Sequence, residues 1–221
     1  LDLRDTVIFT IDGADTKDID DAVSAHRTPY GYQLGVHIAD VSHYVHAHSA
    51  LDEEAFKRGT SVYYADSVIP MLPKELSNGI CSLNEGEDRL AFSCLMELDH
   101  AGRVTNAVLK KTVIRSRVKG VYEEINQWLN GTASEMQKEK YRVVQNELEV
   151  LYEIYQKLAA LHTARGAMDF ESEEAKLTLD ENGICIGVKK RVRGTAERMI
   201  EEFMVLANES VAAIARRAEL P

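Results

Sequence analysis

Strand-like and helix-like segments fall into separate runs along this sequence, and that separation limits the fold classes open to the chain. Residues 90–98 and 104–118 alternate apolar and polar side chains around turn residues 99–102, which predicts a hairpin of two strands. From Met136 to Arg165 the apolar residues recur every three or four positions, which predicts one long amphipathic helix. Such separate runs are typical of the α+β class, so we expect a mixed sheet packed against long helices.

Turn and capping signals predict further elements around these. The β-branched stretch 6–11 predicts a strand, and the turn at 28–31 predicts a hairpin between residues 22–25 and 32–38. The other expected elements are a short helix, a third hairpin and a last helix capped by Thr195, at 52–58, 176–188 and 195–213.

Residues 62–82 contain two prolines and the turn pair Asn78-Gly79, which predicts a long ordered loop. Loops of that length in a compact domain tend to be functional. The sequence has no repeat, low-complexity tract or linker, so we expect one domain over residues 1–221.

Four aspartates lie within ten residues, directly after the first predicted strand: Asp12, Asp18, Asp20 and Asp21. Carboxylates this close repel one another unless a cation or a proton relieves the charge. Magnesium prefers such oxygen ligands, and a pair of bound cations can assist every charge-developing step of phosphodiester hydrolysis. An acidic surface loop without ligands stays open as an alternative, whereas an EF-hand calcium loop is disfavoured by the spacing.

Charge is distributed unevenly along the chain. A net charge of -10 argues against a nucleic-acid-binding domain when it is taken alone. Basic residues are nevertheless concentrated, with six and no acid between 103 and 119 and four more between 189 and 193. Such patches are typical of a groove that follows a nucleic-acid backbone, although basic residues that protect a strand edge explain each patch equally well.

The sequence lacks the patterns of a membrane span, a signal peptide and a disulfide framework. No stretch approaches the roughly 18 apolar residues of a membrane span, and the first residues lack a signal peptide's pattern. We therefore expect a cytoplasmic protein with no membrane partner. Three widely spaced cysteines favour reduced core residues over a disulfide framework or a zinc site: Cys81, Cys94 and Cys185.

Several motifs together resemble those of one enzyme family. Residues 10–22, Thr-Ile-Asp-Gly-Ala-Asp-Thr-Lys-Asp-Ile-Asp-Asp-Ala, resemble the catalytic motif of the RNase II superfamily, and residues 37–45 resemble its next signature. Residues 69–83 and 201–208 are similar to later motifs in the same order. The resemblance is closer to the RNase R branch than to the RNase II branch, and it implies an RNB-type catalytic domain.

That resemblance implies a magnesium-dependent, processive 3′-to-5′ exoribonuclease that hydrolyses single-stranded RNA to nucleoside 5′-monophosphates, with manganese as a possible substitute. It implies that Asp12, Asp18, Asp20 and Asp21 form the catalytic metal centre, with Asp20 the most important for cleavage. It also implies RNA-binding residues of two kinds. Tyr63 and Phe170 would stack on the terminal base, whereas Tyr122 and Glu202 would contact the 3′ nucleotide and favour ribose. His37 and His43 are expected to be structural.

The family domain is expected to continue beyond Pro221, through a segment whose arginine stabilises phosphate charge, and to be flanked by OB-type RNA-binding domains. We therefore interpret residues 1–221 as part of a catalytic domain, with impaired activity by itself. Two alternatives stay open: a catalytically silent RNA-binding member of the family, and an acidic, metal-stabilised structural domain. The sequence does not indicate an oligomeric state.

Overall fold

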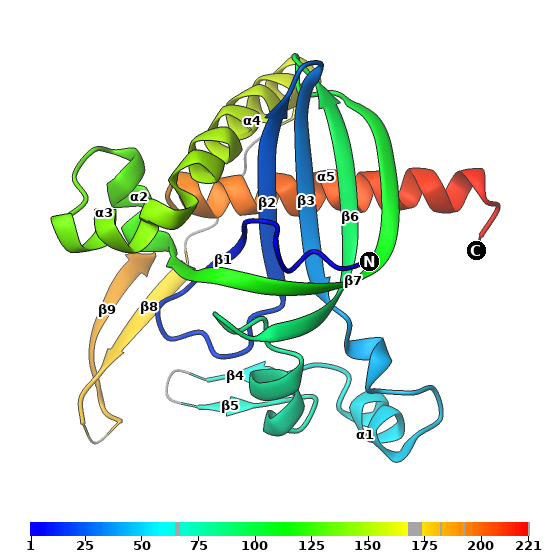
Figure 1. The fold of residues 1–221 in the computed structure, drawn as a ribbon. Helices are drawn as coiled ribbons and strands as arrows, with labels where there is room; N and C mark the ends of the chain where they lie inside the picture. Colours follow the sequence, from blue (N-terminus) through cyan, green and yellow to red (C-terminus); the bar gives the residue numbers. More distant parts are fainter. Residues whose placement is uncertain (65–66, 168–173, 182, 192, 221) are drawn as a thin grey trace.

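Five strands close into a barrel in the computed structural model, which describes residues 1–64, 67–167, 174–181, 183–191 and 193–220 (Figure 1). Neighbouring strands are antiparallel except β1 and β7, which are parallel, so the sheet is mixed as expected. The barrel strands in spatial order are β1 (Ile8–Asp12), β2 (Asp21–Thr28), β3 (Gly31–Ala39), β6 (Asp88–Asp99) and β7 (Val104–Val121).

Closure of the barrel depends on a close approach between its first and last strands. Asp12 pairs with Val121, and Ile11 pairs with Gly120. A Cβ atom at Gly120 would lie 2.5 Å from the carbonyl oxygen of Thr10, so only glycine lets the two backbones come this close. The pairing joins segments about a hundred residues apart, and the local sequence pattern therefore predicted the strands but not the barrel.

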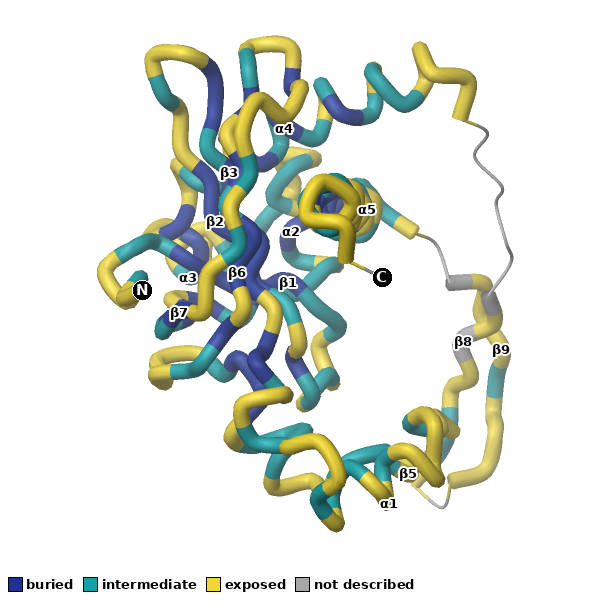
Figure 2. Tube along the Cα trace, turned by 90° about the vertical axis from the view of Figure 1, so that its right-hand side faces the viewer, coloured by how far each residue is buried: buried dark blue, intermediate teal, exposed yellow. Residues whose placement is uncertain are grey.

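Two helices cover the barrel: α4 (Gln145–Ala164) and α5 (Thr195–Arg217) (Figure 1). The apolar residues of α5 recur every three or four positions, so one face of the helix is buried, as Figure 2 shows. The core combines fully buried side chains from strands and helices, among them Phe9, Leu34, Met96, Leu148, Leu151, Met199 and Phe203. The expected α+β architecture with long packed helices is confirmed.

The single helix predicted from Met136 to Arg165 is wrong. The structure has α3 (Glu135–Tyr141), a 3-10 turn η3 (Arg142–Val144) and then α4. Tyr141 is fully buried, and its hydroxyl accepts from the Val121 amide at 3.1 Å, which fixes the chain at the break. Tyr141 and Val144 keep the apolar spacing across η3, so periodicity could not locate the interruption.

One helix was not predicted, and the predicted cap of another is wrong. Helix α2 (Tyr122–Leu129) follows β7 directly, without a turn signal that would have announced it. Thr195 is the first residue of α5 and not its cap. The cap is Gly194, whose amide donates to Glu197 Oε2 at 3.0 Å.

The long loop predicted at 62–82 contains secondary structure. It holds a short hairpin of β4 (Val62–Tyr63) and β5 (Val68–Ile69), followed by the π-helix η2 (Glu75–Ile80), which includes the predicted turn pair Asn78-Gly79. Beneath the barrel, this region lies near α1 (Ala50–Arg58), which follows the 3-10 turn η1 (Val41–His43) (Figure 1). The predicted hairpin near 176–188 is confirmed as β8 (Glu174–Leu179) and β9 (Cys185–Arg191).

A chain of hydrogen bonds joins buried polar side chains of the barrel. His37 Nε2 lies 3.0 Å from Ser24 Oγ, His37 Nδ1 lies 2.7 Å from Ser93 Oγ, and Ser93 Oγ lies 2.7 Å from Thr112 Oγ1. Thr112 donates to the Ala91 carbonyl, so Ser93 donates to Thr112 and accepts from Nδ1 of His37. Burial lowers the pKa of His37 to about 4. The expected structural role of His37 is confirmed, whereas His43 is exposed with its ring edge-on to Tyr44.

All three cysteines were expected to be reduced core residues, and two of them are. Cys81 and Cys94 are free and buried, whereas Cys185 is free but exposed on β9. Its apolar sequence neighbours belong to a two-stranded sheet, which is too small to bury both of its faces. None of the helices in the described part of the chain is long and apolar enough to cross a membrane.

Candidate active site

The four aspartates lie at one end of the barrel, on the connection between two neighbouring strands. Asp12 ends β1 and Asp21 begins β2, while Asp18 and Asp20 lie on the loop between them. Asp12 stabilises the first turn of this loop, because its Oδ1 accepts from the Gly13 amide at 2.7 Å and from Thr16 Oγ1 at 3.0 Å. We call residues 12–21 the aspartate loop.

Hydrogen bonds from Ser82 and Leu83 hold the later half of the aspartate loop. The buried side chain of Ile19 anchors the loop between Asp18 and Asp20. Ser82 Oγ accepts from the Ile19 amide at 3.1 Å and donates to the Lys17 carbonyl at 2.8 Å. The Leu83 amide donates to the Ile19 carbonyl at 2.9 Å. These bonds fix the backbone on both sides of Asp18.

Lys119 of β7 holds the earlier half of the loop. Its Nζ donates to the Thr16 carbonyl at 2.7 Å and to the Ala14 carbonyl at 3.3 Å. Neither Lys119 nor Ser82 was predicted as a site residue. Ser82 does lie within the motif at 69–83, whereas Lys119 was one of several basic residues in the 103–119 stretch.

Burial and mutual repulsion raise the pKa of two carboxyl groups of the aspartate loop. Burial raises the pKa of Asp21 to about 6, with smaller contributions from the negative charges of Asp12 and Asp20. Burial also raises the pKa of Asp20, helped by Asp18 and Asp12. Oxygen Oδ2 of Asp21 is buried and has no hydrogen-bond partner. A cation at this place would offset both the repulsion and the unsatisfied oxygen.

The donor set suits a hard cation, although the side chains do not form a complete cage. In the described part of the chain, no three His, Cys, Asp or Glu side chains meet closely enough to hold a metal ion. Magnesium usually keeps several waters and binds one or two carboxylates together with substrate phosphates. The unpartnered Asp21 oxygen and the raised pKa of two aspartates therefore fit a magnesium or manganese site that substrate completes.

Two of the predicted RNA-binding residues lie beside the aspartate loop. The Tyr63 hydroxyl donates to Asp18 Oδ2 at 2.7 Å, and this bond is the main reason that the pKa of Tyr63 is raised. The Tyr63 side chain is otherwise open to solvent, with 64% of its surface exposed. Tyr122 is half-buried and directly follows Val121, the residue that pairs with Asp12.

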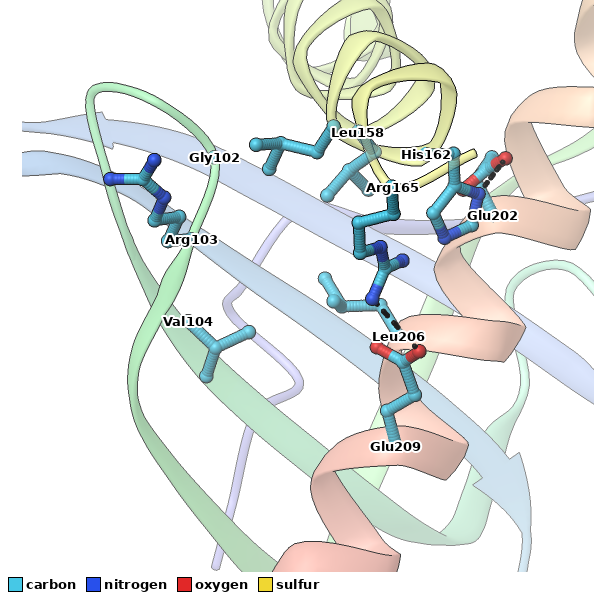
Figure 3. Close-up of a pocket in the computed structure, with 10 residues that line it drawn as sticks. Gly102, Arg103, Val104, Leu158, His162, Arg165, Glu202, Leu206 and Glu209 are labelled. Carbon is cyan, nitrogen blue, oxygen red and sulfur yellow. Dashed lines mark hydrogen bonds and ion pairs between the residues drawn. The ribbon is translucent and has the colours of Figure 1, made fainter. Parts of the chain in front are cut away.

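Glu202 has its contacts elsewhere. It lines a pocket between α4, α5 and the β6–β7 turn, at the opposite end of β7 from Val121 (Figure 3). There its Oε1 lies 2.8 Å from His162 Nδ1. Among the described residues no hydrogen bond or ion pair joins Glu202 to the aspartate loop, and its neighbour Glu201 is exposed. Phe170 lies outside the described residues.

Comparison with known proteins places these features in a family. The RNB domain family matches residues 1–221. The chain belongs to the RNB domain family. Because the match includes every motif quoted above, their agreement is not accidental, and a merely structural acidic domain loses its support.

Relatives of this RNB domain are ribonucleases R. The chain is 54% identical to Ribonuclease R of Thermotoga maritima over 223 residues, covering 100% of the chain and 31% of that protein. It is 40% identical to Ribonuclease R of Escherichia coli over 222 residues, covering 100% of the chain and 27% of that protein. The chain thus spans about a third or less of the length of these relatives.

A solved structure has the same fold. The RNase R of Mycoplasma genitalium in complex with ribose methylated single-stranded RNA aligns with a TM-score of 0.92 and 35% identity. The alignment covers 99% of this chain and 34% of that protein. The similarity supports the barrel and its helices as an RNB fold.

Most basic residues of the 103–119 stretch have partners within the protein. In this RNB domain Arg115 pairs with Asp88 at 2.7 Å, and Lys111 pairs with the buried Asp40 at 3.0 Å. Arg117 donates to the carbonyl of Arg4 at 2.7 Å, and Lys119 holds the aspartate loop. Four of the six basic residues thus bind other parts of the protein. The second patch includes Lys189 and Lys190, which are exposed on β9.

Proposed function

We propose that this RNB domain is part of the catalytic domain of a metal-dependent 3′-to-5′ exoribonuclease. The intact enzyme would hydrolyse single-stranded RNA processively and release nucleoside 5′-monophosphates. Support comes from the ribonuclease R relatives and from the RNA complex of the Mycoplasma genitalium enzyme. A cytoplasmic location is part of the proposal, because free cysteines are typical of a reducing compartment.

The observation that carries this proposal is the set of four carboxylates on one rigid loop, two of them with a raised pKa. Asp12, Asp18, Asp20 and Asp21 would hold magnesium, or manganese in its place. A bound divalent cation supplies a more acidic water and neutralises charge on the phosphate oxygens. The protein's contribution is to fix the carboxylates in advance, through Ser82 and Lys119, so that little reorganisation accompanies the reaction.

RNA contacts complete the proposal. The exposed ring of Tyr63 lies beside Asp18, where it can stack on a base, a contact worth about 1–3 kcal/mol that does not depend on sequence. Tyr122 directly follows Val121, which pairs with Asp12, and this neighbourhood supports its proposed contact to the terminal nucleotide. Phe170 as a second stacking residue and Glu202 as a contact to the 3′ nucleotide belong to the proposal through the family resemblance.

Metal binding gives the first test. Heat scanning of the chain with magnesium, manganese or calcium should show preferential stabilisation by magnesium and manganese. Asp20→Asn should abolish most of this effect, while the matched control Asp15→Asn, an exposed aspartate on the same loop, should retain it. Equal stabilisation of wild type and Asp20→Asn would argue against the proposed metal centre.

RNA hydrolysis gives the second test. A 5′-labelled oligoribonucleotide with magnesium should be shortened from its 3′ end by the wild-type chain and not by Asp20→Asn. We expect a low rate, because the chain spans about a third or less of its relatives and an arginine that stabilises transition-state charge is expected beyond it. Binding without Asp20-dependent cleavage would favour the silent RNA-binding alternative, and rapid processive trimming would show that the additional segments are dispensable.

A further inference from the structure

One hydrogen bond connects the aspartate loop to a hairpin distant in sequence. Tyr63 lies on β4, a strand of two residues, and its hydroxyl donates to Asp18 Oδ2 at 2.7 Å across 45 positions of the chain. Asp12, in contrast, accepts its hydrogen bonds from Gly13 and Thr16 of its own loop. The orientation of Asp18 therefore depends on a residue that the loop itself does not supply.

We propose that the Tyr63 hydroxyl is a positioning group for the metal ligand Asp18, separate from any role of the Tyr63 ring. The inference rests on the proposed metal-dependent function. A carboxylate has about four acceptor sites on its two oxygens. One hydroxyl donor on Oδ2 restricts rotation of the group and occupies only one of these sites, which leaves other sites for a cation.

The electrostatics of the loop make such a donor useful. Asp18 and Asp20 are separated by one residue on the aspartate loop, so two negative charges lie near one another. A hydroxyl that shares the charge of Asp18 reduces this repulsion, and hydrogen bonds to an ionised carboxylate are stronger than neutral ones. Groups that hydrogen-bond to metal ligands typically contribute about 10–100-fold to metal affinity.

The exposure of Tyr63 gives this bond a functional consequence. The ring is 64% exposed, so it is accessible to a nucleotide base while its hydroxyl holds Asp18. A base that stacks on the ring also restricts the hydroxyl. If this restriction changes the affinity for metal at Asp18, occupation by RNA and metal binding each change the other's affinity by the same factor.

The test measures manganese binding by calorimetry for wild type, Tyr63→Phe, Tyr64→Phe and Asp20→Asn. Tyr64 is the matched control, since it is the adjacent tyrosine and is 59% exposed. Tyr63→Phe should bind manganese about tenfold more weakly than wild type, whereas Tyr64→Phe should bind equally well. Heat scanning without metal should show the same unfolding temperature for both variants, which separates positioning from a folding defect.

A second measurement separates the hydroxyl from the ring. Binding of a short oligoribonucleotide in EDTA should be unchanged in Tyr63→Phe and weaker in Tyr63→Leu, while both variants should lose metal affinity equally. If wild type binds manganese better than Asp20→Asn and Tyr63→Phe matches wild type, the positioning role is wrong and the metal centre stands. If wild type binds no better than Asp20→Asn, the metal centre and the positioning role both fail.

Discussion

Replacement of Asp21 by asparagine should stabilise the metal-free protein at neutral pH and much less in acid. Asp21 begins β2, and its Oδ2 is buried without a hydrogen-bond partner. Burial, together with the charges of Asp12 and Asp20, raises the pKa of Asp21 from 3.8 to about 6. Folding therefore favours the protonated form of this carboxyl group.

The sign follows from proton linkage. The contribution of Asp21 to stability is most favourable below the unfolded pKa of 3.8, and it is lost as the pH rises through about 6. A pKa rise of roughly two pH units corresponds to roughly 3 kcal/mol at about 1.4 kcal/mol per unit. Screening by water at the site reduces this free-energy cost, so we expect ionised Asp21 to cost about 1–2 kcal/mol of stability. Asparagine has no charge and is free of this cost.

Urea unfolding in EDTA, at about pH 4 and about pH 8, measures the difference between Asp21→Asn and wild type. The difference should move in favour of the variant by about 1–2 kcal/mol between the two pH values. Exposed Asp15→Asn is the control and should show no such change. Added magnesium should stabilise wild type more than Asp21→Asn. A difference that is the same at both pH values would refute the idea that the ionised Asp21 is costly in the folded protein.

Three further predictions concern residues that hold the site and the barrel. Lys119→Met keeps the aliphatic stem but removes the bonds to the Thr16 and Ala14 carbonyls. Amide hydrogen exchange in residues 13–20 should therefore accelerate, and manganese affinity should fall. The control Lys110→Met, at an exposed lysine, should change neither. Gly120→Ala should lower the free energy of unfolding in urea by about 3 kcal/mol or prevent folding, because its Cβ would lie 2.5 Å from the Thr10 carbonyl oxygen. The control Gly187→Ala should be tolerated, because no neighbouring atom lies closer than 3.9 Å to its Cβ. His37→Gln should make the free energy of unfolding fall less steeply as the pH is lowered. In the folded protein the pKa of His37 is lowered from 6.5 to about 4, so the unfolded chain binds a proton that the folded chain does not. An unchanged pH dependence of the free energy of unfolding would contradict this.

Much of the local structure could be predicted from the sequence. The strand that delivers the aspartate loop, the hairpins around residues 28–31 and 99–102, and the last helix all follow from residue spacing and turn residues. Such signals are local, because each involves neighbours within a few positions of the chain. The motifs likewise identified the four aspartates, and the resemblance supplied the family that residues 1–221 match.

Predictions failed where a residue's role depends on distant partners. Tyr141 and Val144 are buried on both sides of a break in the helix, and burial against the barrel rather than spacing decides that interruption. The sequence left two roles open for the basic residues of β7, a nucleic-acid groove and protection of a strand edge, and it did not show that Asp88 and Asp40 from other segments bind two of them. A one-dimensional charge pattern does not show which charges are paired.

The candidate site shows the same division. The sequence by itself determined that Asp12, Asp18, Asp20 and Asp21 lie close together, since a short loop keeps them near one another. Only the tertiary structure decided what surrounds them: Ser82, Lys119 and Tyr63 reach the loop from three other segments of the chain. The physical reason is that barrel closure brings β7 beside β1, and the 62–82 region contacts the loop through Ser82 and Tyr63. Burial and the resulting pKa shifts then arise from contacts that no local pattern contains.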